Sequence, residues 1–347
     1  MTKSSELRAV SIPPAVMSAA WLIGPKSYLL DRFEPQCEQI FLPPRHMPGA
    51  VLRFGITETT DPDPLTRRAA YTGRQGCTDR LIYDTRRMAP QNWAHFLNDV
   101  LPVFFFVCDQ LGVGPETVTM VLPRKTPAFI VNMAHAIGVE TLLSDLRPRG
   151  PCIHVDAEPY VGIRAIRVEW AALPFSRTLI DPVIDQGAAQ LPSRIFLSRR
   201  GTRVLDNEAE IAAHLQTRGY QTVYPEDLSV ADQLRLFRDA EEVVAVHGAG
   251  LAPMIYALPG GALRQLVEIL PCGHMTDNFR GLADRMGLPW IGVRGRLKPA
   301  YVEPAYKFTE PFLRYSLDSF EVDVASIDVA LDLINERPAL SGRGAPV

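Results

Sequence analysis

The second half of the chain constrains the fold most, because short apolar segments and amphipathic segments alternate there in strict order. The apolar segments are rich in β-branched residues and predict strands, and the segments between them predict helices. Such alternation builds a doubly wound, mostly parallel sheet with helices on both faces. The predicted strands are residues 195–197, 221–224, 243–246, 266–270 and 290–293, and the predicted helices are 207–218, 229–237, 251–258 and 276–286.

The first half carries a weaker pattern of the same α/β kind. The 347 residues suit two domains, and we expect an N-terminal domain over 1–180 and a C-terminal domain over 190–347. A proline-containing stretch at 173–192 is the expected linker. Strands are predicted at 81–83, 118–122 and 161–168 and helices at 92–111, which Pro102 can kink, and at 127–137, while the first 70 or so residues predict strands and loops at a domain edge.

Composition excludes several classes of protein. The net charge of −3 gives no global basic field for nucleic acid. The five cysteines show no C-x-x-C spacing, which favours buried thiols in a reducing compartment over a zinc site. The strongest apolar run, 100–108, is far short of the roughly 20 residues that a membrane span needs. We therefore expect a cytoplasmic protein without a spanning segment, and peripheral membrane contact stays open.

The most specific motif is the turn His247-Gly248-Ala249-Gly250-Leu251, which follows an apolar strand and precedes a predicted helix. Glycines at this place let the backbone approach an anion, and the N–H groups that begin a helix suit a diphosphate. A tight turn of purely structural use is the alternative. The turn lacks the last glycine of the dinucleotide fingerprint, which argues against a nicotinamide-dependent dehydrogenase.

Two further segments lie near the predicted ligand edge. The strand 195–197 ends in Ser198-Arg199-Arg200, and parallel strands would place Arg199 or Arg200 on the same rim as the glycines, where either could bind phosphate. Two solvated arginines are the alternative. Glu268 is a charge inside an apolar strand; it could bind ribose hydroxyls or form a structural ion pair with an arginine, and the residues do not decide between these.

In the first half, Asn92, His95 and Asp99 fall on one face of the predicted helix. Asp99 can hydrogen-bond the imidazole four residues before it, and either residue could take the proton of an attacking hydroxyl. The commoner interpretation of such spacing is a solvated polar face. The sequence Asp61-Pro62-Asp63 has the form of a metal-binding D-x-D, but we interpret it as a loop between prolines.

Taken together, these segments resemble glycosyltransferase family 61. Their order and joint presence carry the resemblance, which covers roughly residues 81–271. The matching residues are 92–102, 197–200, 207–210, 225–226 with Gln233, 247–251 and 267–269.

The resemblance implies a GT-B fold, with two Rossmann-like domains facing across a cleft and the nucleotide-sugar in the second. It implies sugar transfer to a saccharide hydroxyl, with inversion and without an essential metal or cofactor, as in the bacterial branch linked to surface or capsular polysaccharide. An epimerase of the same architecture and a non-catalytic sugar-binding protein are the alternatives. The implied residues are Arg199, Arg200, His247, Gly248, Ala249, Gly250 and Leu251 at the diphosphate, Glu268 near the ribose, and Asp99, His95 and Asn92 on the acceptor side.

Overall fold

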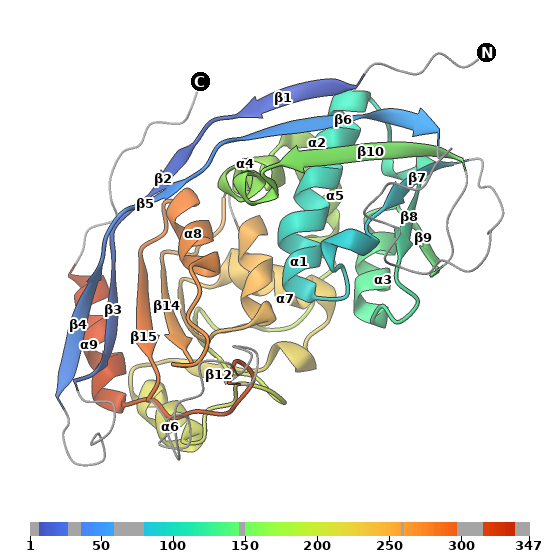
Figure 1. Ribbon diagram of the computed structural model, residues 1–347. Helices are drawn as coiled ribbons and strands as arrows, with labels where there is room; N and C mark the ends of the chain where they lie inside the picture. Colours follow the sequence, from blue (N-terminus) through green and yellow to red (C-terminus); the bar gives the residue numbers. More distant parts are fainter. Residues whose placement is uncertain are drawn as a thin grey trace. The chain divides into compact units, whose positions relative to one another are not determined.

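The computed structural model divides into two compact units (Figure 1). Unit 1 comprises Met1–Ala15 and His46–Gly187, and unit 2 comprises Val16–Arg45 and Ala188–Val347. The structure describes residues 7–26, 36–58, 80–145, 150–257, 260–296 and 315–336.

Unit 2 is built on the doubly wound sheet that the sequence predicts. Within the described residues it has seven strands in the order β12-β11-β13-β14-β15-β3-β4, and all neighbours are parallel except β3 and β4. The five strands predicted in the second half are confirmed. The strands are β3 Ala20–Pro25, β4 Cys37–Leu42, β11 Arg194–Leu197, β12 Gln221–Val223, β13 Glu242–Val246, β14 Gln265–Leu270 and β15 Trp290–Arg294.

Helices cover both faces of this sheet. On one face, helices α6 and α9 pack against a core that includes Phe196, Val244 and Val267. Helices α7 and α8 and the 3₁₀ helix η7 belong to crossovers that run in the opposite direction along the sheet, so right-handed connections place them on the other face. The helices are α6 Glu208–Thr217, η6 Pro225–Asp227, α7 Val230–Asp239, η7 Ala249–Tyr256, α8 Asn278–Arg285 and α9 Val324–Asn335.

Two helix starts in unit 2 differ from prediction. The helix after the glycine turn begins at Ala249 and is 3₁₀, because Pro253 has no N–H to donate to a carbonyl four residues back. Helix α8 is capped at Asp277 instead of Thr276. The predicted cap of α7 is confirmed, since the Ser229 hydroxyl accepts the N–H of Asp232 at 3.1 Å.

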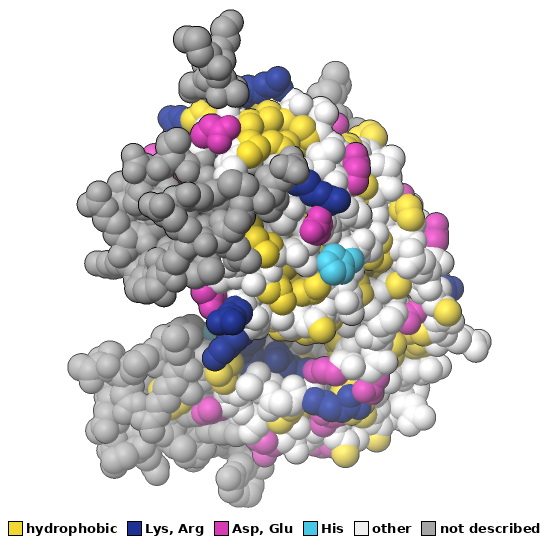
Figure 2. All heavy atoms as spheres, turned by 90° about the vertical axis from the view of Figure 1, so that its right-hand side faces the viewer, with side chains coloured by type: hydrophobic (Ala, Val, Ile, Leu, Met, Phe, Trp, Pro, Cys, Tyr) yellow, Lys and Arg dark blue, Asp and Glu magenta, His cyan; other side chains and the backbone are white. Residues whose placement is uncertain are grey.

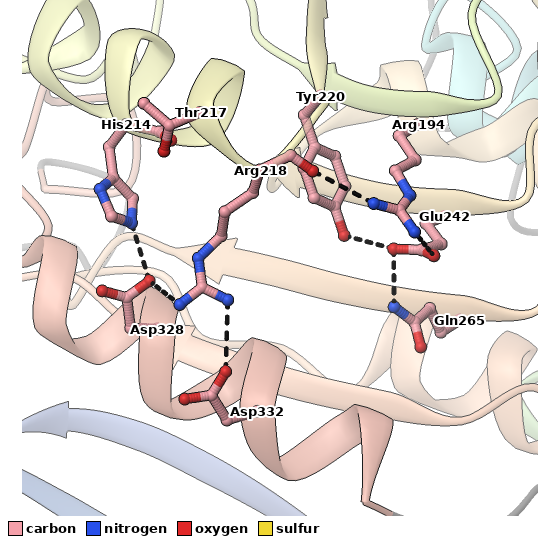
Figure 3. A network of polar contacts seen from close by, with 9 residues as sticks. All are labelled: Arg194, His214, Thr217, Arg218, Tyr220, Glu242, Gln265, Asp328 and Asp332. Carbon is pink, nitrogen blue, oxygen red and sulfur yellow. Dashed lines mark hydrogen bonds and ion pairs between the residues drawn. The ribbon is translucent and has the colours of Figure 1, made fainter.

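A polar network fastens the edge of the sheet where the strands begin (Figure 3). Glu242, at the start of β13, accepts the Tyr220 hydroxyl at 2.7 Å and the Gln265 amide at 3.1 Å. Because it joins strand beginnings, this network stabilises the fold and lies away from the carboxyl ends where α/β sheets bind ligands. A second part of the network joins α6 to α9 through His214, Arg218, Asp328 and Asp332.

Unit 1 has a mixed sheet, with six strands in the described residues in the order β1-β6-β10-β7-β8-β9. The run β10-β7-β8-β9 is parallel, and β1, β6 and β10 form an antiparallel edge. The strands are β1 Arg8–Ile12, β6 Ala50–Glu58, β7 Leu81–Asp84, β8 Val118–Leu122, β9 Glu140–Leu143 and β10 Pro151–Glu158; the pair β2 Ala15–Met17 and β5 Arg45–Met47 forms a separate ribbon.

The predicted helix over 92–111 is real but interrupted by a π-helical turn. Leu101 donates its N–H to the carbonyl of Phe96, five residues back. Pro102 follows directly and cannot donate to Asn98, so regular bonding resumes only after it. The helical elements of unit 1 are η2 Arg86–Met88, α1 Trp93–His95, η3 Phe96–Val100, α2 Leu101–Leu111, η4 Pro115–Thr117, α3 Ala128–Ala136, η5 Tyr160–Ala165, α4 Arg167–Ala171 and α5 Pro174–Asp185.

Two expectations about segments and domains are wrong, and a third holds only in part. Residues 161–168 form η5 and α4 instead of a strand, because β10 ends before Pro159 and cannot continue its ladder through a proline. The expected linker at 173–192 does contain the boundary between the units, after Gly187, but most of it is helix α5 of unit 1. Residues 16–45 belong to unit 2 and not to the N-terminal domain, because β3 pairs with β15.

Both units are therefore α/β, and the arrangement of two domains facing across a cleft stays a prediction. In the described part of the chain, no helix has the length and apolar character of a membrane span. Among the described residues on the face drawn in Figure 2, basic and acidic side chains are interspersed.

Candidate functional site

The glycine turn of unit 2 lies where the strand order of the sheet reverses. The chain passes from β11 to β12 on one side and then returns to β13 on the other side of β11. In open α/β sheets, the carboxyl ends of the strands at such a reversal form the usual ligand site. The register pairs Leu197 with Ala245, so Arg199 and His247 follow at the same edge. The predicted common rim is confirmed.

Arg199 contacts the turn directly. Its Nη1 donates to the carbonyl of His247 at 2.8 Å, and its Nη2 donates to the Thr202 hydroxyl at 3.2 Å. A Cβ on Gly248 would lie 2.2 Å from that Nη1. The backbone of Gly248 is extended, with φ 167°, so a larger residue there would displace the Arg199 guanidinium and not strain the backbone.

Gly250 is required for a different close approach. A Cβ there would lie 2.7 Å from Cγ of Pro225, at the start of η6. A proline ring cannot turn aside as an arginine side chain can. The N–H of Leu251 donates to the carbonyl of Gly248 at 3.1 Å and closes the turn. Ala249 lies between the glycines as the first residue of η7.

Arg200 points to another partner. Its two terminal nitrogens donate to the two carboxylate oxygens of Asp227 at 2.5 and 2.7 Å. Its guanidinium also lies 4.1 Å from the centre of the Tyr224 ring. Of the two arginines predicted for the donor, the structure therefore brings Arg199 to the turn and pairs Arg200 elsewhere on the surface.

Glu268 orients His247 from inside the sheet. One carboxylate oxygen lies 2.6 Å from Nδ1 of His247, and the other accepts the indole N–H of Trp290 at 2.8 Å. The side chain of Glu268 is 0% exposed, so it presents no oxygen to a ribose in this structure. The observed partner is a histidine and not the arginine considered from the sequence. The Glu268 carboxylate holds Nδ1 of His247, which leaves Nε2 as the ring nitrogen for a ligand.

Two residues that the sequence analysis did not select lie beside this turn. Arg203 has the left-handed backbone φ of 57°, which is uncommon for a residue with a Cβ. Its N–H donates to the carbonyl of Leu317 at 3.0 Å, and its Nε donates to the carbonyl of Ser316 at 2.5 Å. The ring of His274 lies 5.2 Å from that of His247.

These side chains influence one another's pKa. Burial, followed by the charge of Arg203, lowers the pKa of Arg199 to about 10. Burial, then Arg203 and His247, lowers the pKa of His274 to about 4. Near neutral pH, His274 is therefore uncharged, and Arg199 and Arg203 supply the positive charge that an anion site requires. The position of His274 shortly after a parallel strand is a signal that the sequence contains. No sequence pattern marks Arg203, which lies four residues after Arg199.

In unit 1, the predicted pair of His95 and Asp99 is formed. Nδ1 of His95 lies 2.8 Å from one oxygen of Asp99, and Nη1 of Arg167 donates to the other at 2.7 Å. Asp99 is 3% exposed, whereas the side chain of His95 is 41% exposed. Burial alone would raise the pKa of Asp99, but the His95 hydrogen bond and the charges of Arg167 and Arg164 outweigh it and lower the pKa.

Asn92 caps the start of this helix. Its side-chain oxygen accepts the N–H groups of Ala94 at 2.9 Å and His95 at 3.4 Å. The cap holds the first turn, and therefore His95, in place. Arg167 was not selected from the sequence because it lies 68 residues after Asp99, in a segment predicted to be a strand.

Metal ligands do not cluster in the described residues, where no group of three His, Cys, Asp or Glu side chains could hold an ion. Asp61-Pro62-Asp63 lies outside the described residues.

Comparison with known proteins adds to this geometry. Residues 93–263 match the family model of Glycosyltransferase 61. The matched region is just under half of the 347-residue chain and contains His95, Asp99, Arg167, Arg199 and the turn at His247.

The chain is also similar to parts of larger curated proteins. It is 36% identical over 170 residues to the beta-1,2-xylosyltransferase XAX1 of Oryza sativa subsp. japonica. The matched segment covers 46% of this chain and 30% of that protein. It is 37% identical over 98 residues to the protein O-linked-mannose beta-1,4-N-acetylglucosaminyltransferase 2 of Xenopus tropicalis, and this match covers 27% of this chain and 16% of that protein. For the Canis lupus familiaris protein of that name, the identity is 25% over 245 residues, and this match covers 60% of this chain and 40% of that protein.

The chain thus spans less than half the length of the curated relatives it matches. All three are named as glycosyltransferases, and together with the family match they support glycosyl transfer as the kind of reaction.

Proposed function

We propose that this chain transfers a sugar from a nucleotide-sugar to a hydroxyl of a saccharide acceptor. The observation that carries the proposal is the cationic turn at the strand reversal of unit 2, where Arg199 contacts the backbone of His247-Gly248. By analogy with the family that its residues 93–263 match, the product belongs to a surface polysaccharide and the enzyme works in the cytoplasm.

Unit 2 holds the donor in this proposal. The diphosphate lies against the backbone of the glycine turn, with the guanidinium groups of Arg199 and Arg203 around it. As an imidazolium, with Nδ1 donating to Glu268, His247 donates from Nε2 to a phosphate oxygen. These groups stabilise the charge that develops on the leaving nucleoside diphosphate, so the transfer does not depend on a metal ion.

Unit 1 supplies the base. Asp99 has a lowered pKa and is held by two partners, which makes it a poor proton acceptor and a good positioning residue for His95. With Nδ1 engaged by Asp99, Nε2 of His95 takes the proton from the acceptor hydroxyl. The hydroxyl oxygen forms its bond to the anomeric carbon as the bond to the diphosphate oxygen breaks. One displacement of this kind inverts the anomeric configuration.

The test is the variant Arg199→Ala, with Arg235→Ala as a matched control on helix α7, where Arg235 pairs with Asp239. Thermal stabilisation by a panel of nucleoside diphosphates and nucleotide-sugars measures donor binding, since a ligand of the folded state raises its stability. Transfer to saccharide acceptors is then measured with the donor that stabilises most. We expect Arg199→Ala to lower turnover by about 10²–10³-fold while the control stays at the wild-type rate.

Two results contradict the proposal. One is wild-type transfer by Arg199→Ala, which removes the arginine from the mechanism. The other is conversion of the free donor to an isomeric nucleotide-sugar without any acceptor, which identifies an epimerase.

A further inference from the structure

The surroundings of His95 contain a cation that the proposed proton transfer does not use. This cation is Arg164, which lies in the 3₁₀ helix η5. Helix α4, which begins with Arg167, follows η5 directly. Its Nε atom is buried and has no hydrogen-bond partner among the residues that the structure describes. A buried donor without a partner costs free energy, so its presence calls for an explanation.

Asp99 does not satisfy Arg164. One of its oxygens accepts from Arg167 and the other contacts His95. Arg164 is nevertheless close enough for its charge to lower the pKa of both Asp99 and Arg167. Arg164 therefore brings a second guanidinium group close to the carboxylate that contacts His95.

This group of side chains reaches the protein surface. Arg164 is half-buried, and Tyr160, in the same 3₁₀ helix, is 42% exposed. The electrostatic influence of Arg164, Arg167 and Asp99 on Tyr160 places its hydroxyl in the same cluster. A guanidinium with an adjacent phenol offers several donors to one oxyanion, and arginine binds carboxylate and phosphate groups in a bidentate way.

We propose that Arg164, with Tyr160, binds an anionic group of the acceptor, a carboxylate or a phosphate, next to the hydroxyl that His95 deprotonates. The inference rests on the proposed function in one respect, that the molecule at His95 is the acceptor. It defines the substrate class: the acceptor residue, or its immediate neighbour, is an acidic or phosphorylated sugar.

The experiment compares three glycosides that differ only at C6: methyl β-D-glucoside, methyl β-D-glucuronide and methyl β-D-glucoside 6-phosphate. Their dissociation constants are measured from the NMR signals of the His95 ring in the full chain. A charge-assisted hydrogen bond is expected to make at least one charged glycoside bind about tenfold or more tightly than the neutral one. The charged glycoside that binds more tightly shows whether the anion is a carboxylate or a phosphate.

In Arg164→Gln this preference disappears, whereas Arg164→Lys keeps part of it and controls for loss of folding. Arg124→Gln, at an exposed arginine of unit 1, keeps the full preference. The inference is overturned if the wild type shows no preference for a charged glycoside, or if Arg164→Gln retains it. Binding of nucleoside diphosphates is measured on the same samples, because its failure would contradict the donor proposal alone and leave this result standing.

Discussion

Substitution of Gly248 by alanine isolates the contact between the turn and Arg199. The new methyl group would lie 2.2 Å from Nη1 and 3.0 Å from Cζ of Arg199, so the guanidinium must leave the His247 carbonyl. The backbone at Gly248 is extended and alanine adopts it without strain. The fold should therefore tolerate the change, since the lower entropy of the unfolded chain, about 0.4–1 kcal/mol, offsets part of the lost hydrogen bond.

The effect on ligand binding should be larger. A charge-assisted hydrogen bond to phosphate contributes about 1.5–3 kcal/mol, which corresponds to about 10–150-fold in Kd. Calorimetric titration with the tightest-binding nucleoside diphosphate measures this, and urea unfolding measures stability. In the Arg199→Ala background, Gly248→Ala should have no further effect, because the methyl group acts through a guanidinium that is already absent. Unchanged affinity in Gly248→Ala alone would refute the assignment of this turn as the diphosphate site.

Three further outcomes follow from the buried polar groups. Asp99→Asn removes the charge of the carboxylate that pairs with buried Arg167 and should lower the free energy of unfolding by about 3–5 kcal/mol, measured in urea. Glu268→Ala leaves the ring nitrogen of His247 and the indole N–H of Trp290 without acceptors, at about 1–3 kcal/mol each, so both the melting temperature and the diphosphate affinity should fall. The pKa of His274 is about 4 in the folded protein, below its ordinary value of 6.5, so the unfolded chain binds a proton first as the pH falls. The free energy of unfolding should therefore decline as the pH falls from about 6.5 to about 4. Unfolding measured across this pH range should show a smaller decline for His274→Gln.

The doubly wound sheet of unit 2 was predictable because its central strands, β13, β14 and β15, are buried on both faces and its helices are short. Each element carries its own periodicity, and the stop and cap signals, such as Ser229, lie next to it in the sequence. The same reasoning failed at 161–168, where the spacing of the apolar residues also fits helical burial. Ile163 and Val168 are buried there, but on η5 and α4.

The functional residues likewise divide into those that a local sequence pattern reveals and those that only the structure reveals. His95 and Asp99 were found because an i, i+4 pair on a helix is a local relation, and Arg199 and His247 because each ends a recognisable strand. No local pattern connects Arg164 to this cluster.

The sequence alone determined the α/β class, the five strands of unit 2 in the second half of the chain and the turn after the third of them, because these depend on residues close together in the chain. Tertiary structure decided that β3 completes the sheet of unit 2, that Arg199 and not Arg200 contacts the turn, and that Arg167 holds Asp99. Each of these is a contact between segments far apart in the chain. Strand pairing, close packing and the pairing of buried charges select such contacts, and none of these leaves a periodic signal in the sequence.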